Sequence, residues 1–211
     1  VTDSATVNDN AYLTVATGLS GTYGIPSDYS TISDARDALA SFGVCDDVIF
    51  NIASGTYTEQ VEFPEILGAS ADATITFKSA TGNTGNVKIV QSSTTNTNNY
   101  VISLVGTDWI TFKDLTIKNT TTGTYSNAVK MTGGASHNTI ENCLIKAGPS
   151  SYTGAGDYST GVYMNGINED ITISNSKIHG GSCNIYWYGA STTSRASGLT
   201  LTNNEIMNSY F

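Results

Sequence analysis

The stretch Ile110-Thr-Phe-Lys-Asp-Leu-Thr-Ile117 aligns without a gap with three later segments of the chain. These segments are Asn138-Thr-Ile-Glu-Asn-Cys-Leu-Ile145, Ile171-Thr-Ile-Ser-Asn-Ser-Lys-Ile178 and Leu199-Thr-Leu-Thr-Asn-Asn-Glu-Ile206. Two apolar columns run through the alignment, and they consist of Phe112, Ile140, Ile173 and Leu201, and of Ile117, Ile145, Ile178 and Ile206. The first column gives a repeat of 28, 33 and 28 residues.

A second recurring strand precedes each of these segments. The four copies are Ile102-Ser-Leu-Val-Gly106, Val129-Lys-Met-Thr-Gly133, Val162-Tyr-Met-Asn-Gly166 and Ile185-Tyr-Trp-Tyr-Gly189. Alternation at period two places the first and third residues of each copy on one face, and a glycine follows where a turn is needed. A repeat of this size built from strands and turns cannot bury its apolar face alone, so successive coils must stack. The repeats therefore predict an all-β solenoid, a parallel β-helix.

A polar column lies between the two apolar columns. Its members, at the same position of each repeat, are Asp114, Asn142, Asn175 and Asn203. Stacked coils lie about 4.8 Å apart, so equivalent side chains fall one above the other. Amides in such a column can bond along the stack. We therefore expect Asn142 and Asn175 to point inward or to face a turn, and to be hydrogen-bonded to adjacent coils.

The chain divides into three parts within one domain. Residues 1–29 are expected to form a leading strand segment, residues 30–43 a capping helix, and residues 44–211 the coils. In the helical part Ile32, Ala35, Leu39 and Phe42 share one face, Ser30 or Ser33 can cap the start, and Gly43 can end it. The earlier coils are predicted to contain strands at Val48–Ile52, Val61–Phe63, Ile75–Phe77 and Val87–Val90. The sequence up to Phe211 contains no second capping element that would match the N-terminal helix. Further coils and domains are therefore expected beyond Phe211.

Composition limits the partners of this protein. Its formal net charge is −9, only 13% of the residues are charged, and the sequence has three cysteines at wide spacing. Such a charge excludes nucleic-acid binding and disfavours polyanionic sugars. No apolar run approaches the length of a membrane span, so membrane insertion is not expected. The low lysine content and the abundance of Thr, Ser and Asn favour an extracellular or cell-surface location.

Two motifs near the start of the chain resemble a known group. Asp28-Tyr-Ser-Thr-Ile-Ser-Asp-Ala35 and Ile52-Ala-Ser-Gly-Thr-Tyr-Thr-Glu-Gln-Val61 look like the opening of pectin methylesterases, within the pectin-lyase-like superfamily. The fuller stretch from Gly43 to Gln60 is more similar to secreted surface proteins of Bacteroidetes. The resemblance implies a right-handed parallel β-helix over essentially the whole chain, with an N-terminal capping α-helix.

The same resemblance argues against esterase activity. Transferred onto this sequence, the family's oxyanion-stabilising glutamine becomes Asn127, its general acid becomes Gly161, and its nucleophilic carboxylate becomes Asn184. Glycine cannot donate a proton, and an amide cannot act as that nucleophile. The arginine of the pattern would lie in a later coil. A lyase of this superfamily would need an arginine base and clustered aspartates, and the chain has only Arg36 and Arg195.

Other chemistry-bearing residues do not form a convincing motif. The acidic pairs Asp46-Asp47 and Glu169-Asp170 are weak metal candidates, because neighbours on a strand point to opposite faces. His137 and His179 fit turn positions at the surface. No metal site and no cofactor are therefore expected, and the cysteines are expected to be buried or unpaired.

One row of side chains could bind a ligand. Ser103, Lys130, Tyr163 and Tyr186 should point outward at equivalent positions of successive coils, with Tyr188 beside the last. Exposed aromatic rings offer apolar area with a polar tip, which suits sugars. Lys130, Tyr163, Tyr186 and Tyr188 are thus the candidate carbohydrate-binding residues. In the alternative, the tyrosines cover each other or are roofed by the loop from Ala147 to Thr160.

Three functional hypotheses follow. The first is a secreted or cell-surface β-helix module without catalytic activity, which acts in carbohydrate binding or adhesion as part of a larger protein. The second is a polysaccharide-active esterase or lyase whose catalytic residues lie beyond Phe211 or follow another pattern. The third is a purely structural stalk. Possible glycans and further domains of the same polypeptide are the expected partners.

Overall fold

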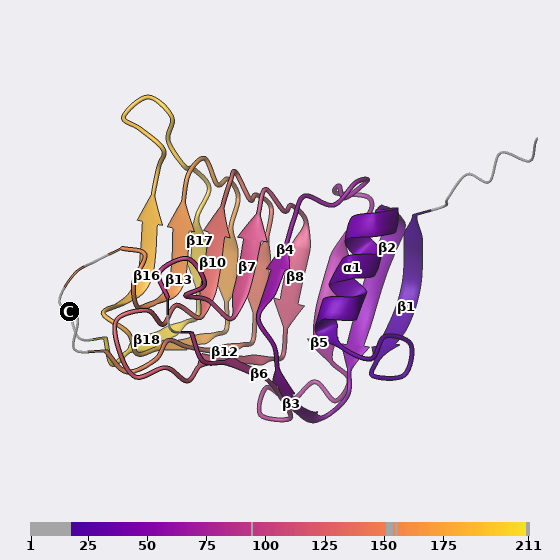
Figure 1. The fold of residues 1–211 in the computed structure, drawn as a ribbon. Coiled ribbons are helices and arrows are strands. Elements are labelled where there is room, and N and C mark those ends of the chain that lie inside the picture. The colour runs from indigo at the N-terminus through magenta and orange to yellow at the C-terminus, as the bar shows by residue number, and fades with distance from the viewer. Residues whose placement is uncertain (1–17, 94, 151–153, 155, 210–211) are drawn as a thin grey trace, which may run out of the picture.

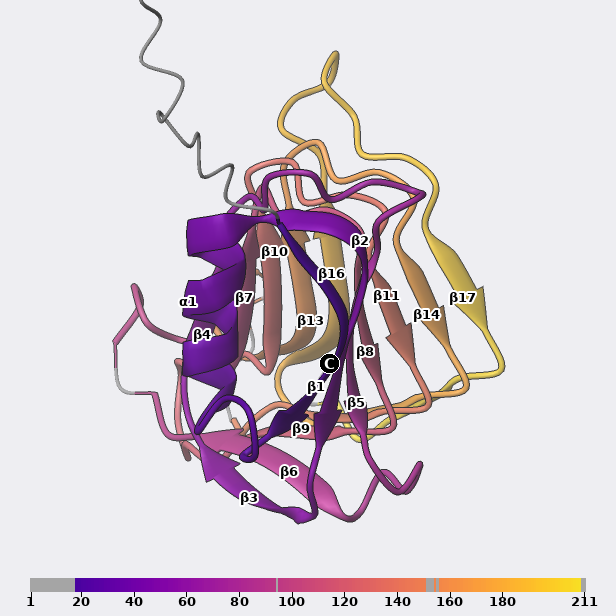
Figure 2. The ribbon, with the colours of Figure 1, turned by 90° about the vertical axis from the view of Figure 1, so that its right-hand side faces the viewer.

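The structure, a computed structural model, describes residues 18–93, 95–150, 154 and 156–209. Its strands form three parallel sheets that wrap around one core (Figures 1 and 2). Sheet A contains β1 (Leu19–Ile25), β2 (Val44–Ile52), β5 (Ile75–Ser79), β8 (Ile110–Lys113), β11 (Thr139–Glu141), β14 (Thr172–Ser174) and β17 (Thr200–Thr202). Sheet B contains β3 (Gly55–Thr58), β6 (Val87–Gln91), β9 (Thr116–Asn119), β12 (Leu144–Lys146), β15 (Lys177–His179) and β18 (Glu205–Met207). Sheet C contains β4 (Val61–Phe63), β7 (Ile102–Val105), β10 (Val129–Thr132), β13 (Thr160–Asn165) and β16 (Cys183–Tyr188).

The strand register confirms the repeat alignment. Phe112 pairs with Ile140, Ile140 with Ile173, and Ile173 with Leu201 along sheet A. The second apolar column is in register along sheet B in the same way. Ile140, Ile173 and Met164 are fully buried, as predicted, whereas Leu201 and Ile206 in the last described coil are exposed. As far as Ile173 and Ile178, the sequence columns are therefore columns of one continuous core.

The N-terminal coils are packed around stacked phenylalanines. The ring centroids of Phe50 and Phe77 lie 4.5 Å apart, and those of Phe77 and Phe112 lie 5.9 Å apart, with nearly parallel planes. Phe63 of sheet C meets Phe77 edge-on. Side chains in register on neighbouring strands of a parallel sheet can stack in this way, and such ring pairs add stability beyond the area they bury.

The polar column occupies the turn between sheets A and B. Asp114, Asn142, Asn175 and Asn203 all have positive φ angles, between 47° and 59°. Asn142 Nδ2 donates a hydrogen bond to Asp114 Oδ1 at 2.6 Å, as predicted. Asn203 Nδ2 lies 3.5 Å from Asn175 Oδ1. Asn and Asp tolerate the left-handed conformation better than other side chains except glycine. The backbone of the turn, which the sequence pattern did not reveal, is thus the second reason for this column.

Replacing Asn142 by leucine should lower the free energy of unfolding by about 1–3 kcal/mol. A leucine in the left-handed conformation is strained by about 1–2 kcal/mol, and the hydrogen bond to Asp114 is worth about 1 kcal/mol. Asn142→Gly is the matched control, because it keeps the backbone conformation and removes only the amide. Urea denaturation measures both variants. A leucine variant as stable as wild type would contradict the turn and ladder argument together.

The helix α1 (Ile32–Phe42) lies beside β4, in line with the strands of sheet C (Figure 1). Its buried residues are Ile32, Ala35 and Leu39, whereas Phe42 is 52% exposed, which the helical spacing did not predict. Thr31, not Ser30 or Ser33, is the N-cap: its side chain accepts from the Asp34 N–H while Asp34 accepts from the Thr31 N–H. Gly43 ends the helix with a φ of 66°, as predicted.

The two N-terminal motifs meet in space. The carboxylate of Glu59 accepts hydrogen bonds from the N–H groups of Ile32 and Ser33, at 3.1 and 2.9 Å, and from the Ser33 hydroxyl at 2.7 Å. A carboxylate at a helix N-terminus satisfies free N–H groups and is favoured by the helix dipole. The glutamate therefore fixes the capping helix to the strand turn that follows β3.

The helix α1 lies within residues 30–43, and the strands from β2 to β18 lie within residues 44–211. Within the leading segment, 1–29, residues 1–17 lie outside the described part and the remainder contains β1, which pairs with β2. The four predicted early strands correspond to β2, β4, β5 and β6. In the described part of the chain, no helix has both the length and the apolar character to cross a membrane.

Candidate functional site

The predicted row of side chains exists on the outer face of sheet C. Ser103 pairs with Lys130, Lys130 with Tyr163, and Tyr163 with Tyr186. Their inward neighbours, such as Met131 and Met164, are fully buried. Tyr188 follows two residues after Tyr186 on the same face. The period-two alternation therefore predicted that Lys130, Tyr163, Tyr186 and Tyr188 lie on the outer face of sheet C, and it predicted their register.

Tyr163 nevertheless does not offer a free ring face. It is only 6% exposed. The Tyr186 ring stacks on the Tyr163 ring, with 5.6 Å between the centroids and an angle of 2° between the planes. The Lys130 ammonium lies 5.7 Å from the centroid of the Tyr163 ring. Burial, and to a lesser extent the charge of Asp157, raises the pKa of Tyr163. Of the two alternatives for this row, the one in which neighbouring side chains cover the ring therefore applies to Tyr163.

Asp157 anchors the loop between β12 and β13 to sheet C. Its carboxylate forms an ion pair with Lys130 at 2.5 Å and accepts from the side-chain amides of Asn127 and Asn99 at 2.7 and 2.9 Å. Lys130 is thus engaged in the fold and is only 16% exposed at its side chain. The sequence identified this loop as a possible roof but did not identify Asp157 as its anchor. A charged side chain in a Gly/Ser/Thr-rich loop was the available signal.

The open part of the row lies at its C-terminal end. Tyr186 is half-buried, Tyr188 is 54% exposed, and their rings are 6.4 Å apart. Beside them lies a shallow pocket of about 330 Å³, formed by Trp187, Tyr188 and the loop that carries Ser191, Thr192 and Arg195. Rings, hydroxyls and a guanidinium can contact an uncharged polyol through both its apolar faces and its hydroxyl groups.

The positions transferred from the esterase pattern are structural here. A Cβ atom at Gly161 would lie 2.5 Å from the Asn184 carbonyl oxygen and 2.6 Å from Ile178 Cγ2. The Asn184 amide is buried and lies 3.2 Å from the carbonyl oxygens of Ile178 and Met207, to which its NH₂ can donate. Asn127 accepts from the Thr160 N–H at 2.7 Å. None of these three residues belongs to the aromatic edge that Tyr186 and Tyr188 form.

The remaining chemistry-bearing residues have structural partners. Asp47 accepts from both donors of Thr74, and His137 stacks on Trp109 with Nδ1 3.4 Å from Asp170. Among the described residues, no three His, Cys, Asp or Glu side chains come together in a way that could hold a metal ion. Cys143 is buried, which raises the pKa of its thiol to about 12, Cys45 is exposed and Cys183 is half-buried; all three thiols are free.

Comparisons with known proteins bear on the fold. Neither a scan of protein-family models nor a search of curated proteins gives a significant match. Two solved structures of the pectin methylesterase of Aspergillus niger, in two deglycosylated forms, each match with a TM-score of 0.56 and 20% identity. A glycosyl hydrolase candidate from Parabacteroides merdae gives a TM-score of 0.43 at 12% identity, over 89% of this chain and 98% of that one.

The match to the Aspergillus niger enzyme covers 90% of this chain and 60% of that one, so this chain spans well under the full length of the enzyme. At this level of identity the match concerns the backbone. The three parallel sheets, the stacked columns and the structural neighbours agree with each other. The chain therefore has the right-handed parallel β-helix fold, which it shares with the pectin methylesterase of Aspergillus niger.

Proposed function

We propose that this β-helix is a carbohydrate-binding module without catalytic activity, which forms part of a longer secreted or cell-surface protein. The observation that carries the proposal is the aromatic edge of Tyr186 and Tyr188 at the open end of the sheet C row. Tyr163 has a supporting role in it, because its ring stacks under Tyr186 and fixes the plane of that ring.

Two further observations support a binding role over a catalytic one. The positions at which the esterase pattern has carboxylates are occupied by Gly161 and Asn184, which can supply neither a nucleophile nor a proton. Among the described residues that line the pocket beside Tyr188, the polar side chains are the hydroxyls of Ser191 and Thr192, the Arg195 guanidinium and the Trp187 indole, and none is a carboxylate. The net charge of −9 favours neutral sugars at this edge over polyanions.

A glycan array followed by calorimetry tests the proposal. Tyr186→Ala with Tyr188→Ala should weaken binding of a neutral oligosaccharide about 5- to 150-fold, since each ring face contributes about 0.5–1.5 kcal/mol. Phe42→Ala is the matched control, because it removes an exposed ring from the opposite end of the solenoid and should leave affinity unchanged. Unchanged binding in the tyrosine variant would place the site elsewhere. Release of methanol from methylated pectin by wild type would overturn the non-catalytic assignment.

A further inference from the structure

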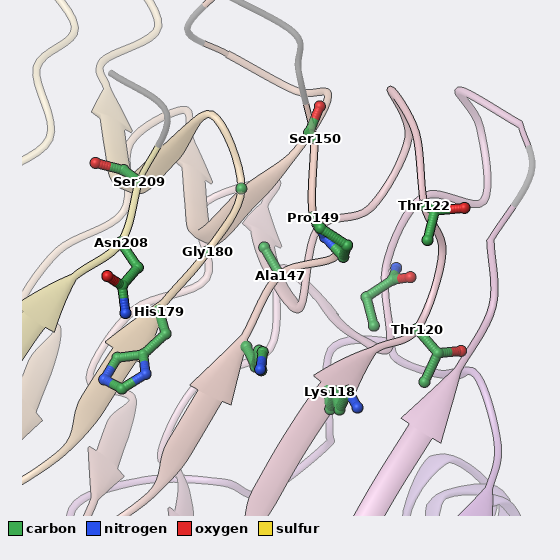
Figure 3. Close-up of a pocket in the computed structure, with 13 residues that line it drawn as sticks. Lys118, Thr120, Thr122, Ala147, Pro149, Ser150, His179, Gly180, Asn208 and Ser209 are labelled. Carbon is green, nitrogen blue, oxygen red and sulfur yellow. The ribbon is translucent and has the colours of Figure 1, made fainter.

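A pocket of about 540 Å³ lies on the outer side of sheet B, on a different face from the tyrosine row. Its floor is formed by the ends of β9, β12 and β15, where Lys118, Lys146 and His179 occupy equivalent positions of three successive coils. Figure 3 shows Lys118 and His179 on strands below the loop residues Pro149, Ser150, Asn208 and Ser209. The pocket thus joins a row of nitrogen-bearing side chains to a rim of hydroxyls and amides.

The row of basic side chains is unusual within this protein. Lys113, Lys130 and Lys177 each have a carboxylate within 2.9 Å. In the part of the chain that the structure describes, no ion pair joins Lys118 or Lys146 to an acidic group, whereas His179 Nε2 lies 3.5 Å from a carboxylate oxygen of Glu205. Like charges directly opposite each other on neighbouring strands are destabilising. A net charge of −9 would have allowed acidic partners here, so the unpaired lysines need another explanation.

The shape of the site indicates what could neutralise the lysines. Gly180 and Gly181 follow His179, and their φ angles of 79° and 76° are those that glycine alone adopts readily. They line the pocket with backbone alone, and the side chains of Thr120 and Thr122 also line it. The volume suits a small molecule and not a polymer surface. Lysines act as point charges toward an oxyanion, and the hydroxyl rim can bond the rest of a hydroxylated ligand.

We propose that this pocket binds a small hydroxylated molecule that carries an oxyanion group, with Lys118 and Lys146 beside the anion and His179 in the wall next to Lys146. The loop residues contact the hydroxyl groups of the same molecule. The site is separate from the aromatic edge of sheet C. It binds anionic ligands, whereas the aromatic edge binds neutral sugars.

The probes are four molecules with one sugar ring: glucose 6-phosphate, glucose 6-sulfate, glucuronate and glucose. Isothermal calorimetry at low salt should detect binding of at least one anionic probe and none of glucose. The three anionic arms show whether a phosphate, a sulfate or a carboxylate is preferred. Glucose bound as tightly as the anions would overturn the proposal, as would failure of all three anions to bind.

A matched pair of double variants distinguishes the loss of lysine contacts in the pocket from the loss of the same positive charge elsewhere on the protein. Lys118→Gln with Lys146→Gln should weaken binding of the preferred anion at least tenfold. Lys78→Gln with Lys88→Gln removes the same charge from outward positions that do not line the pocket, and should change affinity less than twofold. Equal losses in both variants would contradict the proposal. Binding of neutral oligosaccharide by the Lys118 and Lys146 variant should remain at the wild-type level, so this test and that of the aromatic edge can fail independently.

Discussion

Ile173→Asp should unfold the C-terminal coils of the solenoid. Ile173 is completely buried and lies in register between Ile140 and Leu201 in the core column of sheet A. A carboxylate there has no partner and either remains charged in an apolar core or must be protonated, both at a cost of several kcal/mol. We expect a loss of about 4 kcal/mol or more, which is a large share of the total stability of a domain.

Urea denaturation followed by circular dichroism and tryptophan fluorescence measures this loss. Because each coil contacts only its neighbours, the transition should split, with the coils around Trp187 lost before those around Phe77. Thr172→Asp is the control, since its side chain points outward from the same strand, is half-exposed and lies opposite Thr139 and Thr200. It should change stability by no more than about 0.5 kcal/mol. An Ile173→Asp variant that melts with wild type would show that the register is wrong.

The repeat register could be predicted from sequence because stacking leaves little freedom. Coils must pair strand on strand, and a shift by one residue would turn every core side chain outward. Gapless apolar columns through Phe112 and Ile117 therefore determine the alignment of the strands even where loops of different length intervene. The positive φ of Asn142 could not be predicted in this way, because a polar column in a turn fits both hydrogen bonding and backbone conformation.

The ends of the capping helix show where periodicity stops being informative. Helical spacing places Phe42 on the same face as Leu39, but it does not say how far the surface under the helix extends, and Phe42 is exposed. Ser30, Thr31 and Ser33 all have side chains that can cap. Thr31 does so because Asp34 stands three residues later and completes the reciprocal pair of hydrogen bonds.

The candidate site was predictable in direction but not in exposure. Alternation determined that Tyr163 and Tyr186 point outward in register. Coverage of Tyr163 depends on Lys130, which Asp157 holds in place from a distant loop, and no local pattern encodes such a contact. The basic row on sheet B could have been found from the alignment, because Lys118, Lys146 and His179 each follow the apolar residue of the second column.

Gly161→Asp, which places an aspartate where the esterase pattern has its general acid, should destabilise the protein by about 3 kcal/mol or more and should not create an esterase. Its Cβ alone would lie 2.5 Å from a backbone oxygen of Asn184, and backbone in a paired strand cannot move aside cheaply. Overpacking of this kind costs about 1–3 kcal/mol, and enclosing an unpaired carboxylate adds to it. Gly161→Ala measures the steric part separately.

The matched control is Gly55→Asp. Gly55 is also a strand residue, but it is exposed, and a Cβ there would meet only the Tyr57 ring at an ordinary 3.5 Å. The same change should therefore leave the unfolding midpoint nearly unchanged. Thermal unfolding and methanol release from methylated pectin are measured on all three variants. If Gly161→Asp folded as stably as wild type, the space around residue 161 would be larger than the structure shows. If it also released methanol, this face of the β-helix would be a latent active site instead of the packed strand that its neighbours now enclose.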